Sequence, residues 1–484
     1  MHVVVIGGGP AGLSAAYALS KEGVAVTVLE QFPVVGGLAR TVERDGSRFD
    51  IGPHRFFTKS DEVNALWHEV LGPDLLAVDR TTRILYRNQM FDYPLTAVNT
   101  LKGLGAGHAV SMMMSYAAAR ASSKIKPTEA QNFEEWVVQH FGWRLYSAFF
   151  KTYTEKVWGI PCTTIGADWA GQRIKGLTLL EAVKNALGSR GTGPKSLIDQ
   201  FLYPKHGAGM LYERMARFIE ENGGAILCNR KVTHVRHENG QVVSVSCEGP
   251  DGSVEEIACT HCLSSTPLST LVGSMAPDVP AGVQDAADSL RYRHHISVNL
   301  VVQGNPFPDQ WIYVHSKDAK MARIANYRNF SASMACNEDS TPMTVEYFAF
   351  KHDELWQKSD EALVQLAKHE LNATGVCSQD RVQSGFVIRS HQAYPVIEVA
   401  AQARVAEIRN YLGRFPNLLQ IGRSGMFKYN NQDHAIMTGL LAARRVKGEP
   451  VDPWNVNIDA EYHESGASNA QAPDQKPGKE KVAA

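Results

Sequence analysis

Length, composition and charge already exclude several classes of protein. The chain has 484 residues, 44% of them hydrophobic, so it is long enough for two or three domains with sizeable cores. The formal net charge is −1 and no basic stripe is present, which argues against nucleic acid as a partner. Seven scattered cysteines argue against a disulfide framework, and the start of the chain lacks the features of a signal peptide, so we expect a cytoplasmic protein.

The first stretch of the chain carries a dinucleotide-binding pattern. Val3–Ile6 is a short apolar run typical of a buried parallel strand. Gly7, Gly9 and Gly12 follow in G-x-G-x-x-G spacing and lead into a helix predicted from about residue 11 to residue 21. This spacing allows a tight turn, close approach of the backbone to a pyrophosphate, and close packing of the helix on the strand. The helix start adds free N–H groups and a positive dipole end for phosphates.

A second strand and a second glycine turn extend this pattern. The strand is predicted at Val24–Leu29 and ends in Glu30, where an acidic side chain bonds ribose hydroxyls in this type of fold. The turn that follows contains Gly37, Leu38 and Arg40. Because this extension is similar to flavoproteins of the amine oxidase and protoporphyrinogen oxidase kind, we expect FAD rather than NAD.

The next features along the chain are a loop histidine and an apolar helix. A strand and a Gly-Pro turn place His54 on a loop beside aromatic residues, where contact with the flavin ring and ordinary packing are equally open. Residues 82–93 form a predicted hairpin. The apolar stretch Ala109–Ala119 is too short to span a bilayer, so we expect no integral membrane segment. We expect a core helix there, with a membrane-surface helix as the alternative.

Strand and helix patterns divide the rest of the chain. The pattern is helical from about residue 99 to residue 187, and strands around one helix return between residues 201 and 267. We therefore predict an α/β fold, in which a discontinuous Rossmann-like FAD-binding domain carries a helical insertion and a β-sheet substrate domain. The predicted boundaries are 1–80, 196–267 and 391–455 for the FAD-binding domain, 81–98 and 268–390 for the sheet domain, 99–195 for the helical domain and 456–484 for a disordered tail.

The Gly422-Arg423 turn and the helix after it form a second candidate ligand site. A strand that ends in Gly-Arg, a polar loop and a helix start direct another set of N–H donors at a ligand. In a flavin domain we expect that ligand to be the ribityl or pyrophosphate part of FAD. The alternative is a helix capped by its own Asn and Asp residues.

Six segments together resemble the UDP-galactopyranose mutase family, and the eukaryotic type more than the short bacterial type. The resemblance keeps the same order over about residues 1–450. Its most specific parts are the Tyr-Thr-x-Lys-x-Trp-Gly and Asn-Gln-Asp-His motifs. The segments are Gly52–His54, Phe91–Leu95, Tyr153–Gly159, Trp169–Arg173, Tyr203–Gly209 and Gly422–His434.

The resemblance implies a nucleotide-sugar substrate and a reaction without net redox change. It implies reduced FAD, with NAD(P)H as a candidate reductant, and an adduct between the flavin N5 and the anomeric carbon of the sugar. The sugar ring then opens and recloses, which interconverts the pyranose and furanose forms. The departing diphosphate requires cations, and guanidinium groups suit it because they are planar and bidentate.

The same resemblance implies roles for particular residues. The catalytic candidates are His54, Arg323, Arg423 and Asn431. Substrate contacts are expected from Tyr93, Trp158, Arg173, Trp311, Tyr313, Arg323, Tyr394, Tyr429 and Asn431. FAD contacts are expected from Gly7, Gly9, Gly12, Glu30, Gly37, Leu38, Arg40, His54, Val232, Gly422, Arg423, Gln432 and Asp433. No metal site is expected.

Departures from the family pattern leave other functions open. Tyr93–Ala97 lacks the usual amide residue, residues 188–194 align poorly where a substrate flap is expected, and the pair His294-His295 is unexplained. Arg323 lies in a weakly matching segment, so a surface strand position is its alternative. A different nucleotide sugar, an FAD-dependent oxidase or desaturase, and a flavin-free binding protein like the prenylated-GTPase escort proteins are the competing interpretations. The sequence does not determine the oligomeric state.

Overall fold

The first strand of the chain lies at the centre of a parallel sheet. In the computed structural model, which describes residues 1–93, 103, 105–125, 129–167 and 200–457, this sheet has five strands in the order β20–β13–β1–β2–β9. All neighbouring strands pair in parallel, as in a Rossmann-like domain. The strands are β1 (His2–Ile6), β2 (Ala25–Leu29), β9 (Ala225–Leu227), β13 (His261–Ser264) and β20 (Leu418–Gln420).

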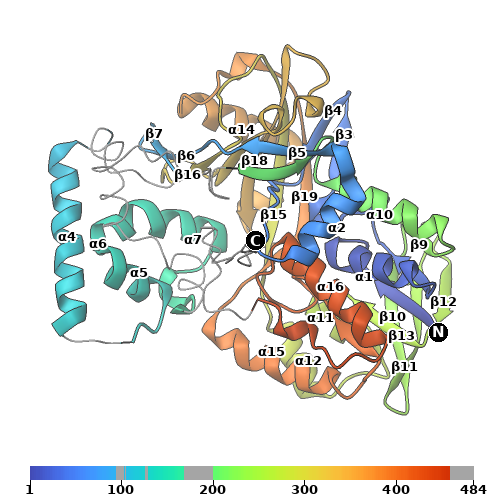
Figure 1. The fold of residues 1–484 in the computed structure, drawn as a ribbon. Helices are drawn as coiled ribbons and strands as arrows, with labels where there is room; N and C mark the ends of the chain where they lie inside the picture. The colour runs from blue at the N-terminus through green and yellow to red at the C-terminus, as the bar shows by residue number, and fades with distance from the viewer. Residues whose placement is uncertain (94–102, 104, 126–128, 168–199, 458–484) are drawn as a thin grey trace, which may run out of the picture.

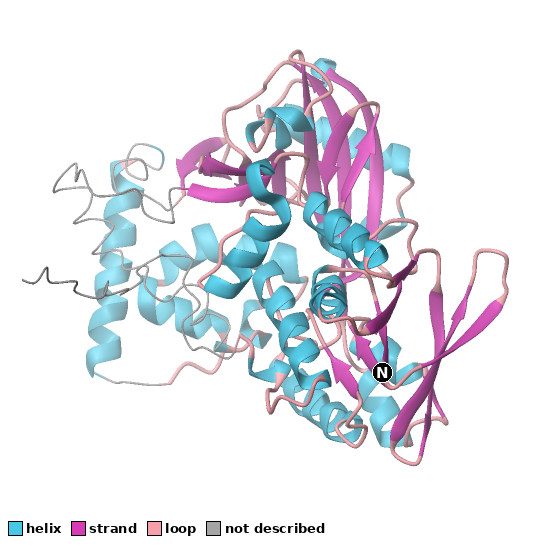
Figure 2. Cartoon of the chain, turned by 45° about the vertical axis from the view of Figure 1, so that its right-hand side comes forward, coloured by secondary structure: helices cyan, strands magenta, loops and turns pink. Residues whose placement is uncertain are grey.

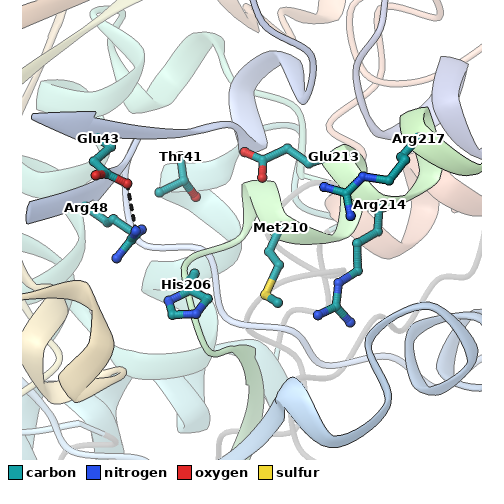
Figure 3. A pocket seen from close by; sticks show the side chains of 8 residues that line it. All are labelled: Thr41, Glu43, Arg48, His206, Met210, Glu213, Arg214 and Arg217. Atoms are coloured by element: carbon teal, nitrogen blue, oxygen red, sulfur yellow. Dashed lines mark ion pairs between the residues drawn. The ribbon is translucent and has the colours of Figure 1, made fainter. Parts of the chain in front are cut away.

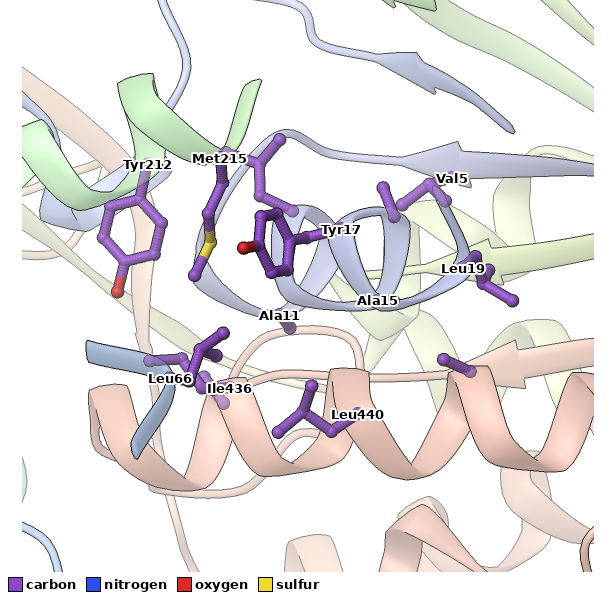
Figure 4. Packing of buried hydrophobic residues seen from close by; sticks show 14 of the residues in the cluster. Val5, Ala11, Ala15, Tyr17, Leu19, Leu66, Tyr212, Met215, Ile436 and Leu440 are labelled. Carbon is purple, nitrogen blue, oxygen red and sulfur yellow. The ribbon is translucent and has the colours of Figure 1, made fainter. Parts of the chain in front are cut away.

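Strand β1 is buried on both faces because other layers cover the sheet from both sides. Val3, Val4 and Val5 are fully buried. Val3 and Val5 belong to a core shared with helices, part of which is drawn in Figure 4. Val4 belongs to a second core on the opposite face. A strand buried on both faces needs an unbroken apolar run, and this explains the sequence pattern at the start of the chain.

Four helices cover the first face, namely α1 (Pro10–Lys21), α2 (Asp61–Leu71), α10 (Gly209–Glu221) and α16 (Gln432–Val446). Helix α1 packs against both α10 and α16 (Figure 4). The contact with α16 is tight at Gly439, where an added Cβ would lie 2.2 Å from the carbonyl oxygen of Ala11. This close packing brings the last helix of the fold to the first, and with it the loop that precedes α16.

A second, smaller sheet and three helices cover the opposite face. The sheet has the order β12–β11–β10–β14 and forms the hairpin layer at the right of Figure 2. Its strands are β10 (Lys231–Glu238), β11 (Gln241–Glu248), β12 (Val254–Ala258) and β14 (Met275–Ala276). The helices are α11 (Leu268–Gly273), α12 (Ala281–Asp288) and α15 (Val399–Leu412).

The largest sheet has seven strands in the order β19–β15–β18–β17–β16–β6–β7. It stands at the top of the molecule in Figure 1, with α13 (Glu354–Gln357) and α14 (Asp360–Ala373) beside it. Its neighbours are antiparallel except for the parallel pair β16–β6. The strands are β6 (Thr82–Tyr86), β7 (Gln89–Asp92), β15 (Tyr292–Gln303), β16 (Trp311–Val314), β17 (Arg323–Asn326), β18 (Ser340–Ala349) and β19 (Val382–Pro395). The predicted fold class is confirmed, whereas the domain boundaries stay predictions.

A group of helices lies at the left of Figure 1, beyond one end of the large sheet. It consists of α4 (Ala106–Ile125), α5 (Phe133–Phe141), α6 (Trp143–Leu145), the π-helical turn Tyr146–Lys151 and α7 (Thr152–Trp158). The prediction of a core helix at residues 109–119 is wrong, because α4 buries Met112 but exposes 47% of Met113 and 62% of Met114. Among the described helices, none is long and apolar enough to cross a membrane.

Short elements complete the described chain. They are the hairpin β3 (Thr41–Arg44) with β4 (Ser47–Asp50), the antiparallel pair β5 (Leu75–Asp79) with β8 (Gln200–Pro204), and 3-10 turns at Gly37–Ala39, Gly72–Asp74, Cys162–Thr164, Tyr327–Asn329, Ala332–Met334, Gln379–Arg381 and Pro453–Asn455.

Candidate functional site

The turn between β1 and α1 forms a cradle that only small residues allow. Gly7 has a φ of +98°, and a Cβ added at Gly12 would lie 2.0 Å from the carbonyl oxygen of Gly7. The amide of Gly7 donates to Leu29 O at 2.8 Å, which ties the turn to the end of β2. The backbone path therefore requires glycine at positions 7 and 12, and the side chain of Ser265, 2.3 Å from an added Cβ at Gly7, adds to this requirement.

The second glycine turn closes this cradle from the other side. The amide of Gly36 donates to Gly8 O at 2.7 Å, and a Cβ added at Gly37 would lie 3.1 Å from the Cα of Gly9. Helix α1 starts with Pro10, and the preceding Gly9 provides no side-chain cap. The first-turn amides of α1 therefore face a narrow backbone groove, which suits the pyrophosphate of a dinucleotide.

Glu30 lies at the end of β2 beside this cradle. It is 5% exposed, and its carboxylate accepts from the amides of Gly8 at 2.8 Å and Phe32 at 2.9 Å. Burial raises the pKa of Glu30, although these amides and the charge of Arg40 act in the opposite direction. Arg40 donates to Gly37 O at 2.8 Å. The acid is thus held at the place where a ribose is bound in this fold.

The start of α16 completes the ligand groove. Asn431 and His434 form a reciprocal capping box, with the amide of Asn431 donating to His434 Nδ1 at 3.2 Å. Gln432 donates from Nε2 to the Tyr212 hydroxyl at 2.5 Å. Its Oε1 is buried and makes no hydrogen bond within the described part of the chain. This acceptor and the glycine cradle together fit a bound FAD, which offers N–H groups as well as phosphates.

Two arginines and several aromatic rings form a second part of the site, here called the arginine–aromatic cluster (Arg323, Arg423, Trp158, Tyr394 and Tyr429). The guanidinium of Arg423 lies 4.9 Å from the ring centre of Tyr394 and 5.1 Å from that of Tyr429. The rings of Trp158 and Tyr429 are 5.3 Å apart. Cation–π contacts with two rings hold the guanidinium in one orientation.

Arg423 and Arg323 differ in how their charges are balanced. Arg423 donates from Nε to Asn430 O at 2.8 Å, and no described carboxylate forms an ion pair with it. Arg323 on β17 lies with Nε 2.5 Å from Glu346 Oε2 and donates from Nη2 to the Tyr394 hydroxyl at 3.2 Å. Arg423 therefore brings a positive charge without an acidic partner, whereas Arg323 is positioned by an acid.

Glu346 is the functional candidate that the sequence analysis missed. It is fully buried on β18, and His295 Nε2 lies 2.8 Å from its Oε1. Burial raises the pKa of Glu346, but the charge of Arg323 and the bond to His295 outweigh burial and hold that pKa below its usual value. The available signal was a lone acid in the apolar strand segment 342–350, where burial demands a charged partner.

The loop that carries His54 starts at Gly52, beside this ion pair. A Cβ added at Gly52 would lie 2.4 Å from Glu346 Oε1, so the loop passes directly over the carboxylate. His54 Nδ1 is 2.9 Å from Gly52 O. Burial, and then the charge of Arg423, lower the pKa of His54 to about 4. The ring is therefore neutral at pH 7; Nδ1–H donates to the Gly52 carbonyl and Nε2 is left as an acceptor.

The remaining predicted substrate residues divide into two groups. Tyr313 lies 5.3 Å from Tyr93 and 5.5 Å from Tyr153, between ring centres, and these tyrosines extend the aromatic surface away from the cluster. Trp311 is only 2% exposed and packs among core residues, with Arg55 over its ring at 5.2 Å. Arg173 lies outside the described residues.

The other predicted cofactor residues lie around the groove. Val232 is half-buried on β10, two residues after Arg230, whose amide donates to Glu30 O at 2.8 Å. Asp433 is buried in the first turn of α16. Leu38 lies in the 3-10 turn Gly37–Ala39, which belongs to the second glycine turn, and the amide of Gly422 donates to Thr438 Oγ1 at 2.9 Å.

Two cations fix the end of α7 and so place Trp158. Lys156 donates from Nζ to three carbonyls, those of Val314, Ser316 and Met321, at 2.9–3.0 Å. Arg293 donates from Nε to Val157 O at 3.1 Å. Both cations bind backbone carbonyls. The lysine of the Tyr-Thr-x-Lys motif therefore stabilises the position of α7 and does not itself face the ligand.

The paired histidines of β15 point to opposite sides of the strand. His295 belongs to the ion-pair group described above, whereas His294 Nδ1 accepts from the amide of Gln392 at 2.9 Å. The ring of His294 lies 4.6 Å from that of Trp356. Because side chains alternate along a strand, only His295 faces the site.

A pocket of about 300 Å³ lies between α10 and the β3–β4 hairpin, apart from the arginine–aromatic cluster (Figure 3). Two of its three arginines already have acidic partners, since Arg48 pairs with Glu43 at 2.7 Å and Arg214 pairs with Asp74. We assign it no ligand. The lining residues are Thr41, Glu43, Arg48, His206, Met210, Glu213, Arg214 and Arg217.

The fold and the glycine cradle define a flavin-type dinucleotide-binding enzyme. A profile of the family described as "Flavin containing amine oxidoreductase" matches residues 10–447, and the chain belongs to this family. The protein is accordingly a flavoenzyme, and membership of this family supports FAD as its flavin.

The individual proteins that are similar to this chain include both mutases and an oxidase. A curated relative from Klebsiella pneumoniae, named "Probable UDP-galactopyranose mutase", is 27% identical over 173 residues, which are 34% of this chain and 43% of the relative. The chain thus aligns with less than half of that relative. A crystal structure of reduced UDP-galactopyranose mutase has a TM-score of 0.80 at 20% identity, covering 93% of this chain and 96% of the other. A putrescine oxidase variant has a TM-score of 0.60 at 15% identity, covering 92% and 98%.

Proposed function

We propose that this protein is a flavin-dependent mutase that interconverts the pyranose and furanose forms of a nucleotide sugar, most simply UDP-galactose. The observation that carries the proposal is the Arg423 guanidinium, which lies against two tyrosine rings without an acidic partner among the described residues. A fixed, uncompensated guanidinium suits a diphosphate, which has two negative groups and accepts bidentate hydrogen bonds.

Arg323 supplies the second cation of the proposed diphosphate site. Its Nη2 points to the Tyr394 hydroxyl at 3.2 Å, and Glu346 holds the rest of the guanidinium. The buried carboxylate keeps Arg323 charged and in one orientation when the site is empty of substrate. The Tyr394 and Tyr429 hydroxyls add donors that do not change the charge. These groups stabilise the diphosphate as it leaves the anomeric carbon.

Bound FAD in its reduced form supplies the nucleophile for the anomeric carbon. The residues of the chain bind, orient and exclude water. His54 is neutral at pH 7 because of burial and the nearby arginines, so it adds no charge against the flavin, and its Nε2 is an acceptor for a sugar hydroxyl or a flavin N–H. Trp158 and Tyr429, with rings 5.3 Å apart, form an apolar wall beside the cations.

Charge argues against an amine as the substrate. Arg323 and Arg423 bring two cations to the site, and Glu346, the described carboxylate paired with Arg323, leaves the charge of Arg423 uncompensated. A protonated amine would be repelled there, whereas an anionic nucleotide is attracted. An oxidase of a neutral substrate stays as the second candidate, because the same fold is found in oxidases.

An anaerobic assay tests the proposal. Purified protein is reduced with dithionite and mixed with UDP-galactofuranose, and the sugar products are separated. We expect conversion to the pyranose form by the reduced protein and none by the oxidised protein. Absence of conversion, with reoxidation of the flavin and a dehydrogenated product from another substrate, would instead establish an oxidase.

A further inference from the structure

The last described residues fold back onto the loop that carries the arginine of the site. Residues 452–457, here called the C-terminal strap, include the short helical turn Pro453–Asn455, whose cap Asp452 accepts from the amide of Trp454 at 3.0 Å. Lys428 reaches the strap from the loop. Its Nζ donates to Trp454 O at 2.6 Å and to Val456 O at 3.2 Å.

Asn457 makes the contact closest to the site. Its Nδ2 donates to Tyr429 O and to Asn430 Oδ1, both at 3.2 Å. Asn457 has a φ of +57°, a left-handed conformation that asparagine adopts more readily than most residues. One amide group therefore bonds the two residues that precede Asn431.

Asn430 transmits this contact to Arg423. Its carbonyl oxygen accepts from Arg423 Nε at 2.8 Å, and its Nδ2 donates to Gly422 O at 3.0 Å. Asn430 is only 1% exposed. Tyr429, on the other side of the same contact, places its ring against the Arg423 guanidinium. Asn457, Asn430 and Arg423 thus form a continuous chain of hydrogen bonds from the strap to the guanidinium.

We propose that the C-terminal strap positions the Arg423 guanidinium, with Asn457 as the positioning residue and Lys428 as the second attachment. One consequence, tighter binding of a nucleoside diphosphate, rests on the proposed function. The other consequence, a fixed conformation of the loop 422–431, does not. The loop 422–431 is not a helix or a strand, so its few internal backbone hydrogen bonds leave side-chain contacts to help fix its conformation. The strap provides four such hydrogen bonds from one short segment.

The test uses two matched substitutions in the full-length flavoprotein. Asn457→Asp keeps the size of the side chain and tolerates the left-handed conformation, but it removes the donor and places a carboxylate against two oxygen atoms. Asn455→Asp adds the same charge two residues away on an exposed side chain and serves as the control. Lys428→Met removes the other attachment from the loop side and gives an independent second variant.

Two measurements separate the effect of the strap on the loop conformation from its effect on nucleotide binding. Hydrogen–deuterium exchange of residues 422–431 reports the loop without any ligand, with exchange in β1 and α1 as the internal reference. A titration with UDP, followed by tryptophan fluorescence, gives the dissociation constant. We expect both Asn457→Asp and Lys428→Met to speed exchange in the loop, to weaken UDP binding about tenfold and to raise KM with little change in kcat. FAD content and the control variant should match the wild type.

Each outcome decides one of the two proposals. The strap proposal is overturned if hydrogen exchange in the loop is unchanged in both Asn457→Asp and Lys428→Met. It is also overturned if the control Asn455→Asp speeds loop exchange by the same amount. Faster loop exchange with an unchanged dissociation constant for UDP overturns its functional consequence. A wild-type protein that binds no UDP at all contradicts the proposed function, and the exchange measurement then still decides whether the strap holds the loop.

Discussion

The glycine cradle and the arginine–aromatic cluster are built in opposite ways. The cradle comes from one stretch of chain, residues 7–40, and its contacts run from backbone to backbone or from backbone to the side chains of Glu30 and Arg40. The cluster takes its members from α7, β17, β19 and the loop before α16. Its contacts are between side chains, such as Arg423 with Tyr394 and Tyr429.

The difference explains how one fold can keep its cofactor and change its chemistry. A local backbone cradle depends on a few glycines, so it persists as long as the strand–turn–helix unit folds. A dispersed cluster depends on long-range packing and on individual side chains, so single substitutions can alter it without affecting the cofactor. Substitutions in the two regions should therefore have separable effects.

The largest effect is expected from Gly12→Ala. The added Cβ would lie 2.0 Å from the carbonyl oxygen of Gly7, a backbone atom that cannot move without opening the turn. We expect FAD content per polypeptide to fall at least tenfold, roughly, with loss of all activity. The flavin absorbance of the purified protein measures this. Gly273→Ala, where an added Cβ meets nothing within 4 Å, is the control; a Gly12→Ala protein with full FAD content would contradict the cradle.

Arg423→Ala should separate binding of the cofactor from turnover. The substitution removes the uncompensated guanidinium but leaves the glycine cradle intact, so the protein should stay yellow and lose activity by about a hundredfold or more. Arg414→Ala removes an exposed arginine that also lies over a tyrosine ring, at 5.5 Å, and should have no effect. Steady-state kinetics and flavin absorbance measure both. Normal turnover by Arg423→Ala would exclude the proposed diphosphate contact.

Glu346→Gln should leave the Arg323 guanidinium in the site but change its orientation. The buried guanidinium loses its acidic partner and the site becomes more positive, so UDP should bind as tightly as before or more tightly, while kcat falls about tenfold. Glu370→Gln is a matched control, since Glu370 is also a buried acid but bonds Tyr347 and the amide of Met321, on the other side of β18. Weaker UDP binding by Glu346→Gln would show that the acid contributes in another way.

The smallest effect is expected at Asp50, which lies between the two regions. This fully buried carboxyl accepts from Thr41 at 2.6 Å, from Tyr203 at 2.7 Å and from the amide of Ala208 at 3.1 Å. Burial raises its pKa to about 7, although these hydrogen bonds act in the opposite direction. The folded protein therefore holds a proton that the unfolded chain releases near pH 4, and stability should fall as the pH rises from about 4 to 7.

Asp50→Asn should remove this part of the pH dependence. The amide carries no titratable proton, so the Tm of the variant should vary about 2 °C less between pH 4 and pH 7 than the Tm of the wild type. Thermal unfolding followed by circular dichroism at several pH values measures the slope. Parallel curves for the variant and the wild type would mean that Asp50 stays ionised in the folded state.

Sequence patterns predicted the parts of the molecule that depend on neighbouring residues. The apolar run before Gly7, the glycine spacing and the acid at Glu30 all lie within one strand–turn–helix–strand unit, and the structure places them as expected. The helix start at Asn431 was also predictable, because capping is a local effect. Arg423 and Arg323 were correctly brought into one region, but only through a resemblance and not through spacing.

The burial and contacts of other residues could not be predicted, because they depend on elements that are distant in the sequence and pack against them in the fold. Glu346 lies 51 residues from His295 in the sequence, and the antiparallel pairing of β15 with β18 brings their strands together. Trp311 was expected near the substrate, yet it is 2% exposed, because the rings of Phe201 and Phe330, from distant parts of the chain, pack against it. Helix α4 was expected in a core, yet it exposes Met113 and Met114. An apolar side chain does not by itself determine which element packs against it.

The sequence by itself determined the dinucleotide cradle, since the cradle follows from backbone geometry within a few dozen residues. The α/β class came from strand and helix patterns along the whole chain, and the expectation of FAD came from a similarity to known flavoproteins. Only the tertiary structure decided which arginine is balanced by an acid, that the Gly52 loop passes over Glu346, and that the C-terminal strap bonds the loop of Arg423. Charge balance and burial depend on groups that are distant in the chain, and folding alone brings those groups within hydrogen-bond distance.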